Sequence, residues 1–141
     1  MSRDMDATYY EPSGARGIFM GGGLFLVSVP VHLSVAQDVS VLLSAITLAL
    51  IGGAYIGFAA RHAAEKVFWS ELAVAVGFGL VAFAGVLWWP ALIGLGLIAH
   101  AGWDILHHRH EFGAEVPGWY ISLCVVFDVA AGVFLLFLYG F

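Results

Sequence analysis

Charged residues are scarce in this sequence. Only 11% of its 141 residues are Asp, Glu, Lys or Arg, whereas soluble globular domains carry about 25%. Apolar residues make up 62% of the chain, and the mean hydropathy is +0.95. A chain this short cannot hide so much apolar surface inside a water-soluble fold. The composition therefore excludes a soluble domain and predicts a protein embedded in a lipid bilayer.

Cysteine and basic residues are also few, and each shortage excludes a class of protein. A single cysteine, Cys124, can form no internal disulfide and cannot build a zinc site from several thiolates. Five Lys and Arg residues stand against ten Asp and Glu, for a net charge of −5. Proteins that bind nucleic acid carry a clustered basic face. We therefore expect no nucleic-acid partner, and the bilayer itself is the expected surrounding.

The apolar residues form five runs separated by short polar segments. Each run is close to the roughly 20 residues that a helix needs to cross about 30 Å of hydrocarbon. Helix is expected because a span must satisfy its own backbone hydrogen bonds. The sequence predicts an all-α integral membrane bundle, with a polar N-terminal tail (residues 1–16) and a single transmembrane domain (residues 17–141). The five expected spans are residues 17–36, 39–60, 67–89, 90–108 and 118–139.

All five basic residues fall on one side of a five-span bundle. Arg3 and Arg16 precede the first span, Arg61 and Lys66 lie between the second and third, and Arg109 lies between the fourth and fifth. Basic residues are enriched in cytoplasmic loops of membrane proteins. We therefore predict a multi-pass protein with a cytoplasmic N-terminus and a C-terminus outside.

Ionisable residues gather in one half of the predicted bundle. In a helix at 100° per residue, His100, Asp104 and His107 fall within an arc of about 60°. The helical rise places residues of the third and fifth spans at a similar depth. A charged residue at a helix centre costs roughly 2.5–3.5 kcal/mol to insert, so such residues mark functional sites by default. The six residues concerned are Glu71, His100, Asp104, His107, His108 and Asp128.

Imidazoles and carboxylates on one helix face suit several kinds of chemistry. They can bind zinc or another divalent transition metal, with His100, Asp104, His107 and His108 as the expected ligands. Glu71 and Asp128 are then expected as catalytic residues, acting as general base or orienting a ligand from behind.

Three alternatives to a metal site remain open. The same groups can form a proton relay. Haem ligation is a further possibility, but a second histidine, His32, lies in the opposite leaflet and pairs poorly with His100. The cluster can also be structural, since hydrogen bonds between membrane helices contribute about 0.6 kcal/mol each.

The segment around these histidines resembles sequences of a known kind. The motif His-Ala-Gly-Trp-Asp-Ile-Leu-His-His at 100–108, followed by Val-Pro-Gly-Trp-Tyr at 116–120, Cys124 and Asp128, resembles a set of small uncharacterised multi-pass prokaryotic membrane proteins. The resemblance covers the C-terminal third and implies a prokaryotic inner membrane, but no activity. The pattern is also distantly similar to membrane-embedded zinc hydrolases of the ceramidase and progestin-receptor-like type, which are larger and whose full ligand pattern this chain lacks.

These observations favour one function and leave two others open. The leading prediction is a small membrane-embedded, metal-dependent hydrolase that acts on a lipid or other apolar substrate. The alternative is a non-catalytic subunit or accessory protein of a larger membrane complex, with a structural polar cluster. The third is a proton or small-solute carrier, which would need a homo-oligomer to form a pore. A carrier predicts a polar path from Asp38 or His32 to Glu71.

Overall fold

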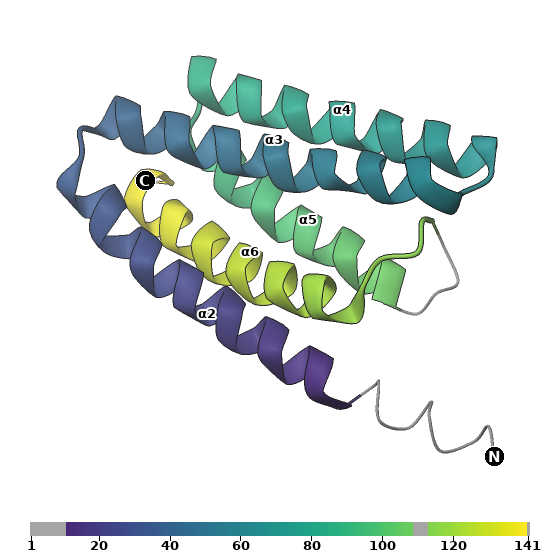
Figure 1. Ribbon diagram of the computed structural model, residues 1–141. Coiled ribbons are helices and arrows are strands. Elements are labelled where there is room, and N and C mark those ends of the chain that lie inside the picture. Colours follow the sequence, from purple (N-terminus) through teal and green to yellow (C-terminus); the bar gives the residue numbers. More distant parts are fainter. Residues whose placement is uncertain (1–10, 109–112, 141) are drawn as a thin grey trace.

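The computed structural model describes residues 11–108 and 113–140. The expected all-α fold is confirmed for these residues, which contain helices and no strands (Figure 1). Arg3 and Arg109, together with the first ten residues of the expected polar tail, lie outside the described residues. The helices are α2 (Glu11–Ser34), α3 (Gln37–His62), α4 (Glu65–Leu87), α5 (Ala91–His108) and α6 (Gly118–Tyr139).

The helix boundaries differ from the expected spans mainly at the first helix. The chain is helical from Glu11, six residues before the expected start at Gly17. The helix therefore extends beyond the apolar residues that the sequence analysis used to place the span.

Within the described residues, four helices have the length and apolarity of membrane spans. They are the segments Gly14–Ser34, Gln37–Arg61, Glu65–Leu87 and Gly118–Tyr139. Large apolar side chains point outward from them, including Phe19, which is 80% exposed, and Phe137, which is 77% exposed. Continuous outward apolar surface of this extent indicates an integral membrane protein.

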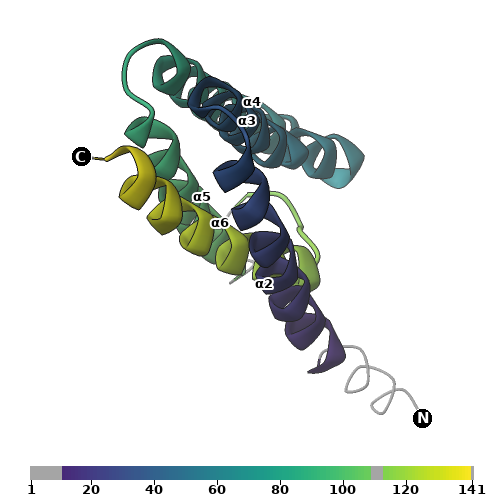
Figure 2. The same cartoon turned by 90° about the vertical axis from the view of Figure 1, so that its left-hand side faces the viewer.

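The helices form two layers (Figures 1 and 2). The antiparallel pair α3 and α4 makes one layer, while α2, α6 and α5 lie side by side in the other. Helix α5 also contacts α3 and α4, and half of its 18 residues are buried. It is therefore the helix through which the two layers meet.

A close helix crossing sets the position of the site. A Cβ on Gly94 of α5 would lie 2.8 Å from the carbonyl oxygen of Gly132, and a Cβ on Gly132 would lie 2.7 Å from that of Gly94. Side chains at either position would push α5 and α6 apart. Because Asp128 lies one turn before Gly132, the crossing brings that carboxylate against His100.

The larger apolar cluster and the buried ionisable residues lie towards opposite ends of the bundle. Eight buried residues near the 35–36 and 88–90 turns form the apolar cluster: Val41, Ala45, Leu48, Ala82, Ile93, Leu97, Ala131 and Leu135. Glu71, His100, Asp104, His107 and Asp128 are all buried towards the opposite end. The expected gathering of ionisable residues in one half is thus what the fold produces.

Candidate metal centre and the neighbouring histidine–glutamate pair

One imidazole and two carboxylates meet between α5 and α6. His100 Nδ1 lies 2.8 Å from Asp128 Oδ2 and 3.3 Å from Asp104 Oδ2. All three side chains are fully buried. One ligand atom from each residue falls within 4.8 Å of the others. This group, named the metal-ligand group below, could hold a metal ion.

Local structure explains how the metal-ligand group is held. His100 and Asp104 are four residues apart on α5 and so share one face of the helix. The hydroxyl of Tyr55, from α3, donates a hydrogen bond to Asp104 Oδ1. The rings of Tyr55 and Phe78 pack edge-on against the His100 imidazole, with centroids 5.6 and 5.0 Å away. Residues from four helices, α3, α4, α5 and α6, therefore supply or surround the donor atoms.

The charges and hydrogen bonds of the metal-ligand group are incomplete. Asp128 Oδ1 and His100 Nε2 are buried and have no hydrogen-bond partner among the described residues. A buried polar atom without a partner costs about 1–3 kcal/mol. Even a protonated imidazole balances only one of the two carboxylates. A bound cation would supply the missing charge.

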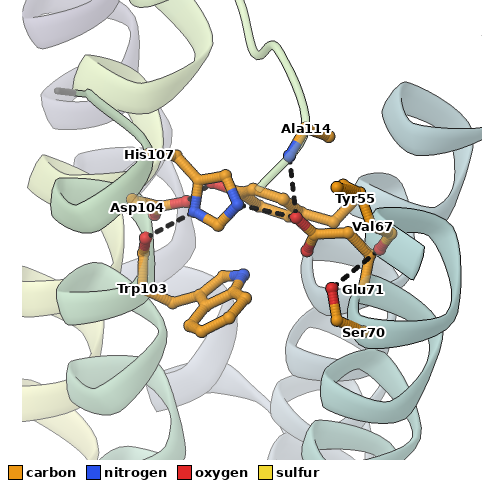
Figure 3. Close-up of polar contacts among 8 residues, drawn as sticks. All are labelled: Tyr55, Val67, Ser70, Glu71, Trp103, Asp104, His107 and Ala114. Carbon is orange, nitrogen blue, oxygen red and sulfur yellow. Dashed lines mark hydrogen bonds and ion pairs between the residues drawn. The ribbon is translucent and has the colours of Figure 1, made fainter. Parts of the chain in front are cut away.

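A second pair lies one turn further along α5 (Figure 3). His107 Nδ1 lies 2.9 Å from the carbonyl oxygen of Trp103, and His107 Nε2 lies 2.7 Å from Glu71 Oε1. A carbonyl oxygen can only accept, so Nδ1 carries a hydrogen. The other nitrogen then shares a single proton with the Glu71 carboxyl group, whichever of the two atoms holds it. The His107–Glu71 pair is thus arranged for proton transfer.

The loop before α6 covers this pair. The backbone N–H of Ala114 donates to Glu71 Oε1 at 3.0 Å, as Figure 3 shows. Gly113 adopts φ +80°, and a Cβ there would lie 2.5 Å from Glu71 Oε1 and closer still to His107 Nε2. On its other side the loop borders a hollow of about 490 Å³, which Arg61 and Val67 also line. Gly113 and Ala114 therefore lie between the His107–Glu71 pair and a hollow that is large enough to hold water.

The structure divides the residues that the sequence analysis grouped together. His100 and Asp104 join Asp128, which was expected in a catalytic role rather than as a ligand. His107, expected as a ligand, pairs instead with Glu71. The Tyr55 ring lies between the two groups, with its centroid 4.7 Å from that of His107.

His108, the fourth expected ligand, joins neither group and is exposed. One residue along a helix turns a side chain by about 100°. That turn carries His108 off the face that bears His107, which accounts for the difference between the two neighbours.

Sequence reasoning missed the residues that support the site. Tyr55 received no role, although a buried tyrosine hydroxyl usually finds a partner and this was the available signal. Trp103 contributes its backbone carbonyl group to His107 and packs its indole ring against the same imidazole, with centroids 4.9 Å apart, while Ala114 contributes its backbone N–H. Backbone contacts depend on loop geometry and leave no mark in residue type, except at Gly113, whose positive φ favours glycine.

A separate polar cluster closes the other end of the bundle. His32 Nδ1 lies 2.7 Å from Ser40 Oγ, and the Tyr139 hydroxyl donates to the same oxygen at 2.6 Å. Along α3, α5 and α6, the apolar cluster lies between this end and the metal-ligand group. Among the described residues, polar side chains therefore do not form a continuous path across the bundle.

No protein-family model, curated protein or solved structure matches this chain. The arrangement of the site residues therefore carries the functional argument.

Proposed function

We propose that this protein is an intramembrane metalloprotein that holds zinc or another divalent transition metal through His100, Asp104 and Asp128. The observation that supports the proposal is the convergence of their three buried ligand atoms within 4.8 Å. Imidazole and carboxylate together suit Zn, Fe and Mn. Ligand atoms of a tetrahedral zinc site lie about 3.3 Å apart, given bonds of about 2.0–2.1 Å. The 3.3 Å from His100 Nδ1 to Asp104 Oδ2 matches that value. The 2.8 Å to Asp128 Oδ2 is a hydrogen-bond distance, so these two atoms would move slightly apart around an ion.

The proposed reaction is hydrolysis of a lipid or other apolar substrate. A bound ion would polarise the scissile carbonyl or phosphoryl group and activate water. The Tyr55 hydroxyl holds Asp104 in its ligand position, and such supporting contacts are worth 10- to 100-fold in metal affinity or activity. The His107–Glu71 pair would move the proton, with the hollow beside Gly113 as the source of water.

The proposed topology has five spans with the N-terminus in the cytoplasm of a prokaryotic cell. Among the described basic residues, Arg16, Arg61 and Lys66 all lie at the end of the bundle that carries the His107–Glu71 pair (Figure 1). The positive-inside rule supports a cytoplasmic position for that end. Helix α5 would be the fifth span, since its 18 residues rise about 27 Å.

Elemental analysis of the detergent-purified protein tests the metal proposal. We expect near-stoichiometric metal in the wild type and its loss in His100→Ala and Asp128→Asn. His108→Ala is the matched control, because it removes an exposed imidazole from the same helix and should keep the metal. A folded wild-type protein that stays metal-free after incubation with Zn, Fe(II) and Mn would refute the proposal.

A separate measurement tests the proposed hydrolysis. The metal-loaded protein in vesicles should release product from at least one member of a panel of phospholipid, sphingolipid and ester substrates. Glu71→Gln should lose this activity while it keeps the metal, because Glu71 lies outside the metal-ligand group. Activity unchanged by Glu71→Gln would remove the His107–Glu71 pair from the reaction.

One observation supports a second function, that of a non-catalytic subunit of a larger membrane complex or homo-oligomer. Among the described residues, helix α5 makes polar side-chain contacts with three neighbouring helices. The pairs are Tyr55–Asp104 to α3, Glu71–His107 to α4 and Asp128–His100 to α6. Such contacts would hold the helices in register without any chemistry. Metal-free protein that migrates with a partner in mild detergent would favour this function.

A further inference from the structure

An apolar groove lies between α2, α3 and α6. The three side chains of the metal-ligand group are not part of its lining. Its volume is about 360 Å³. Helix α2 packs along α6 and scarcely touches α3, and residues of all three helices line the groove. Gly17 and Gly21 allow the close contact of α2 with α6, since a Cβ on either would clash with the α6 backbone. The groove is thus a consequence of how α2 packs.

The groove offers almost nothing to a polar solute. Among the described residues that line it, none is Asp, Glu, Lys or Arg. The hydroxyls of Ser28 and Thr47 donate within their own helices, to the carbonyl oxygens of Phe25 and Leu43. A ligand in the groove would therefore contact the methylene group of Ser28 and the methyl group of Thr47. Apart from His32 at one end and Cys124 at the other, the remaining walls are aliphatic or aromatic, so the groove suits an apolar ligand.

Size and position select the ligand. The lining residues of α2 extend from Leu24 to His32, a rise of about 12 Å. One leaflet of hydrocarbon is about 15 Å thick, half of a core of about 30 Å. The groove therefore matches one extended hydrocarbon chain of nearly a leaflet's length.

We propose that this groove binds one acyl chain of a bilayer lipid, with the chain's methyl end directed at Cys124. The His32 end of the groove lies two residues from the end of α2, at the level of a membrane surface. Cys124 lines the groove at its other end and lies one turn before Asp128 on α6. The chain would thus reach from a headgroup near His32 to the neighbourhood of the metal-ligand group. The inference does not depend on a bound metal.

Photocrosslinking in nanodiscs tests this inference. The probe is a phosphatidylcholine with a diazirine near the methyl end of one chain, present in trace amount in unlabelled phosphatidylcholine. Mass spectrometry should locate the adducts mainly on the α6 segment that contains Cys124 and Phe127. A second probe, with the diazirine near the carbonyl group, should instead label the segment around Val31.

Two variants separate a bound chain from lipid that merely surrounds the protein. Thr47→Trp fills the groove and should lower labelling of Cys124 and Phe127 at least fivefold. Leu80→Trp is the matched control, since Leu80 is 62% exposed on α4 and does not line the groove. It should leave that labelling unchanged. Ser28→Phe fills the groove from α2 and replaces Thr47→Trp if the latter fails to fold.

Either of two results would overturn the proposal. The first is labelling spread evenly over the outward faces of all helices, with α4 labelled as strongly as the α6 segment. The second is labelling of the α6 segment that a folded groove-filling variant leaves unchanged. In both cases the lipid contact is that of any membrane protein.

Discussion

Gly113→Ala should destabilise the protein more than any other glycine-to-alanine change in the loop or helix around the site. The residue adopts φ +80°, where a side chain costs roughly 1–2 kcal/mol. The added Cβ would also lie 2.5 Å from Glu71 Oε1 and closer to His107 Nε2. Neither atom can retreat freely, because both belong to the buried His107–Glu71 pair.

The loop must therefore shift, and the shift has a cost of its own. Displacement of the loop breaks the hydrogen bond from the Ala114 N–H to Glu71, and a buried group that loses its partner costs about 1–3 kcal/mol. This cost adds to that of placing a side chain at positive φ, so the variant should lose roughly 2–5 kcal/mol of unfolding free energy. The metal-ligand group lies outside the loop, so metal content should not change.

The assay is SDS-induced unfolding in mixed micelles, followed by far-ultraviolet circular dichroism. Gly102→Ala is the control, because Gly102 lies within α5 and a Cβ there meets nothing within 4 Å. Alanine is the better helix former, so this variant should gain up to about 1 kcal/mol. A Gly113→Ala variant within about 0.5 kcal/mol of the wild type would refute the inferred packing of the loop on the pair.

Three further predictions concern other contacts. Tyr55→Phe should lower metal affinity about 10- to 100-fold, measured by competition with a chelating dye, because Asp104 loses the hydrogen bond that orients it; equal affinity would contradict the role given to Tyr55. Ser40→Ala should cost about 1–3 kcal/mol in the SDS assay, since a phenol and an imidazole lose their shared partner. Gly21→Ala should destabilise the contact between α2 and α6 and lower the thermal midpoint, whereas Gly22→Ala, with open space around it, should not; equal midpoints would contradict the close packing.

The fold class could be predicted because lipid imposes a simple rule. Five apolar runs of near-spanning length admit helices and little else, and the helix limits agree to within three residues except at the start of α2. The start of α2 at Glu11 was not predicted, since helix and hydrocarbon need not begin at the same residue. Hydropathy reports the environment of a segment, while the helix follows from backbone hydrogen bonds.

The site could be predicted only as far as depth and helical phase allow. Those two quantities place His100, Asp104 and Asp128 in the same half of the bundle. They do not say which carboxylate meets which imidazole, because that depends on how closely helices approach. The crossing at Gly94 and Gly132 decides it for Asp128, and its closeness is set by two glycines among eighteen.

Helix α5 shows why apolarity alone is a poor guide to the helix that matters most. It is absent from the segments that qualify as spans by length and hydropathy, yet half of its residues are buried, while the qualifying windows are only 11–39% buried. A helix that touches protein on most sides does not need an apolar surface, because its polar side chains can pair with neighbours instead of facing lipid. Four ionisable residues lower its hydropathy, and three of them, His100, Asp104 and His107, are supplied with partners by α3, α4 and α6. The fourth, His108, is exposed at the end of the helix. A lower hydropathy in a helix of near-spanning length, flanked by strongly apolar spans, is therefore itself a signal of a central position and of a site.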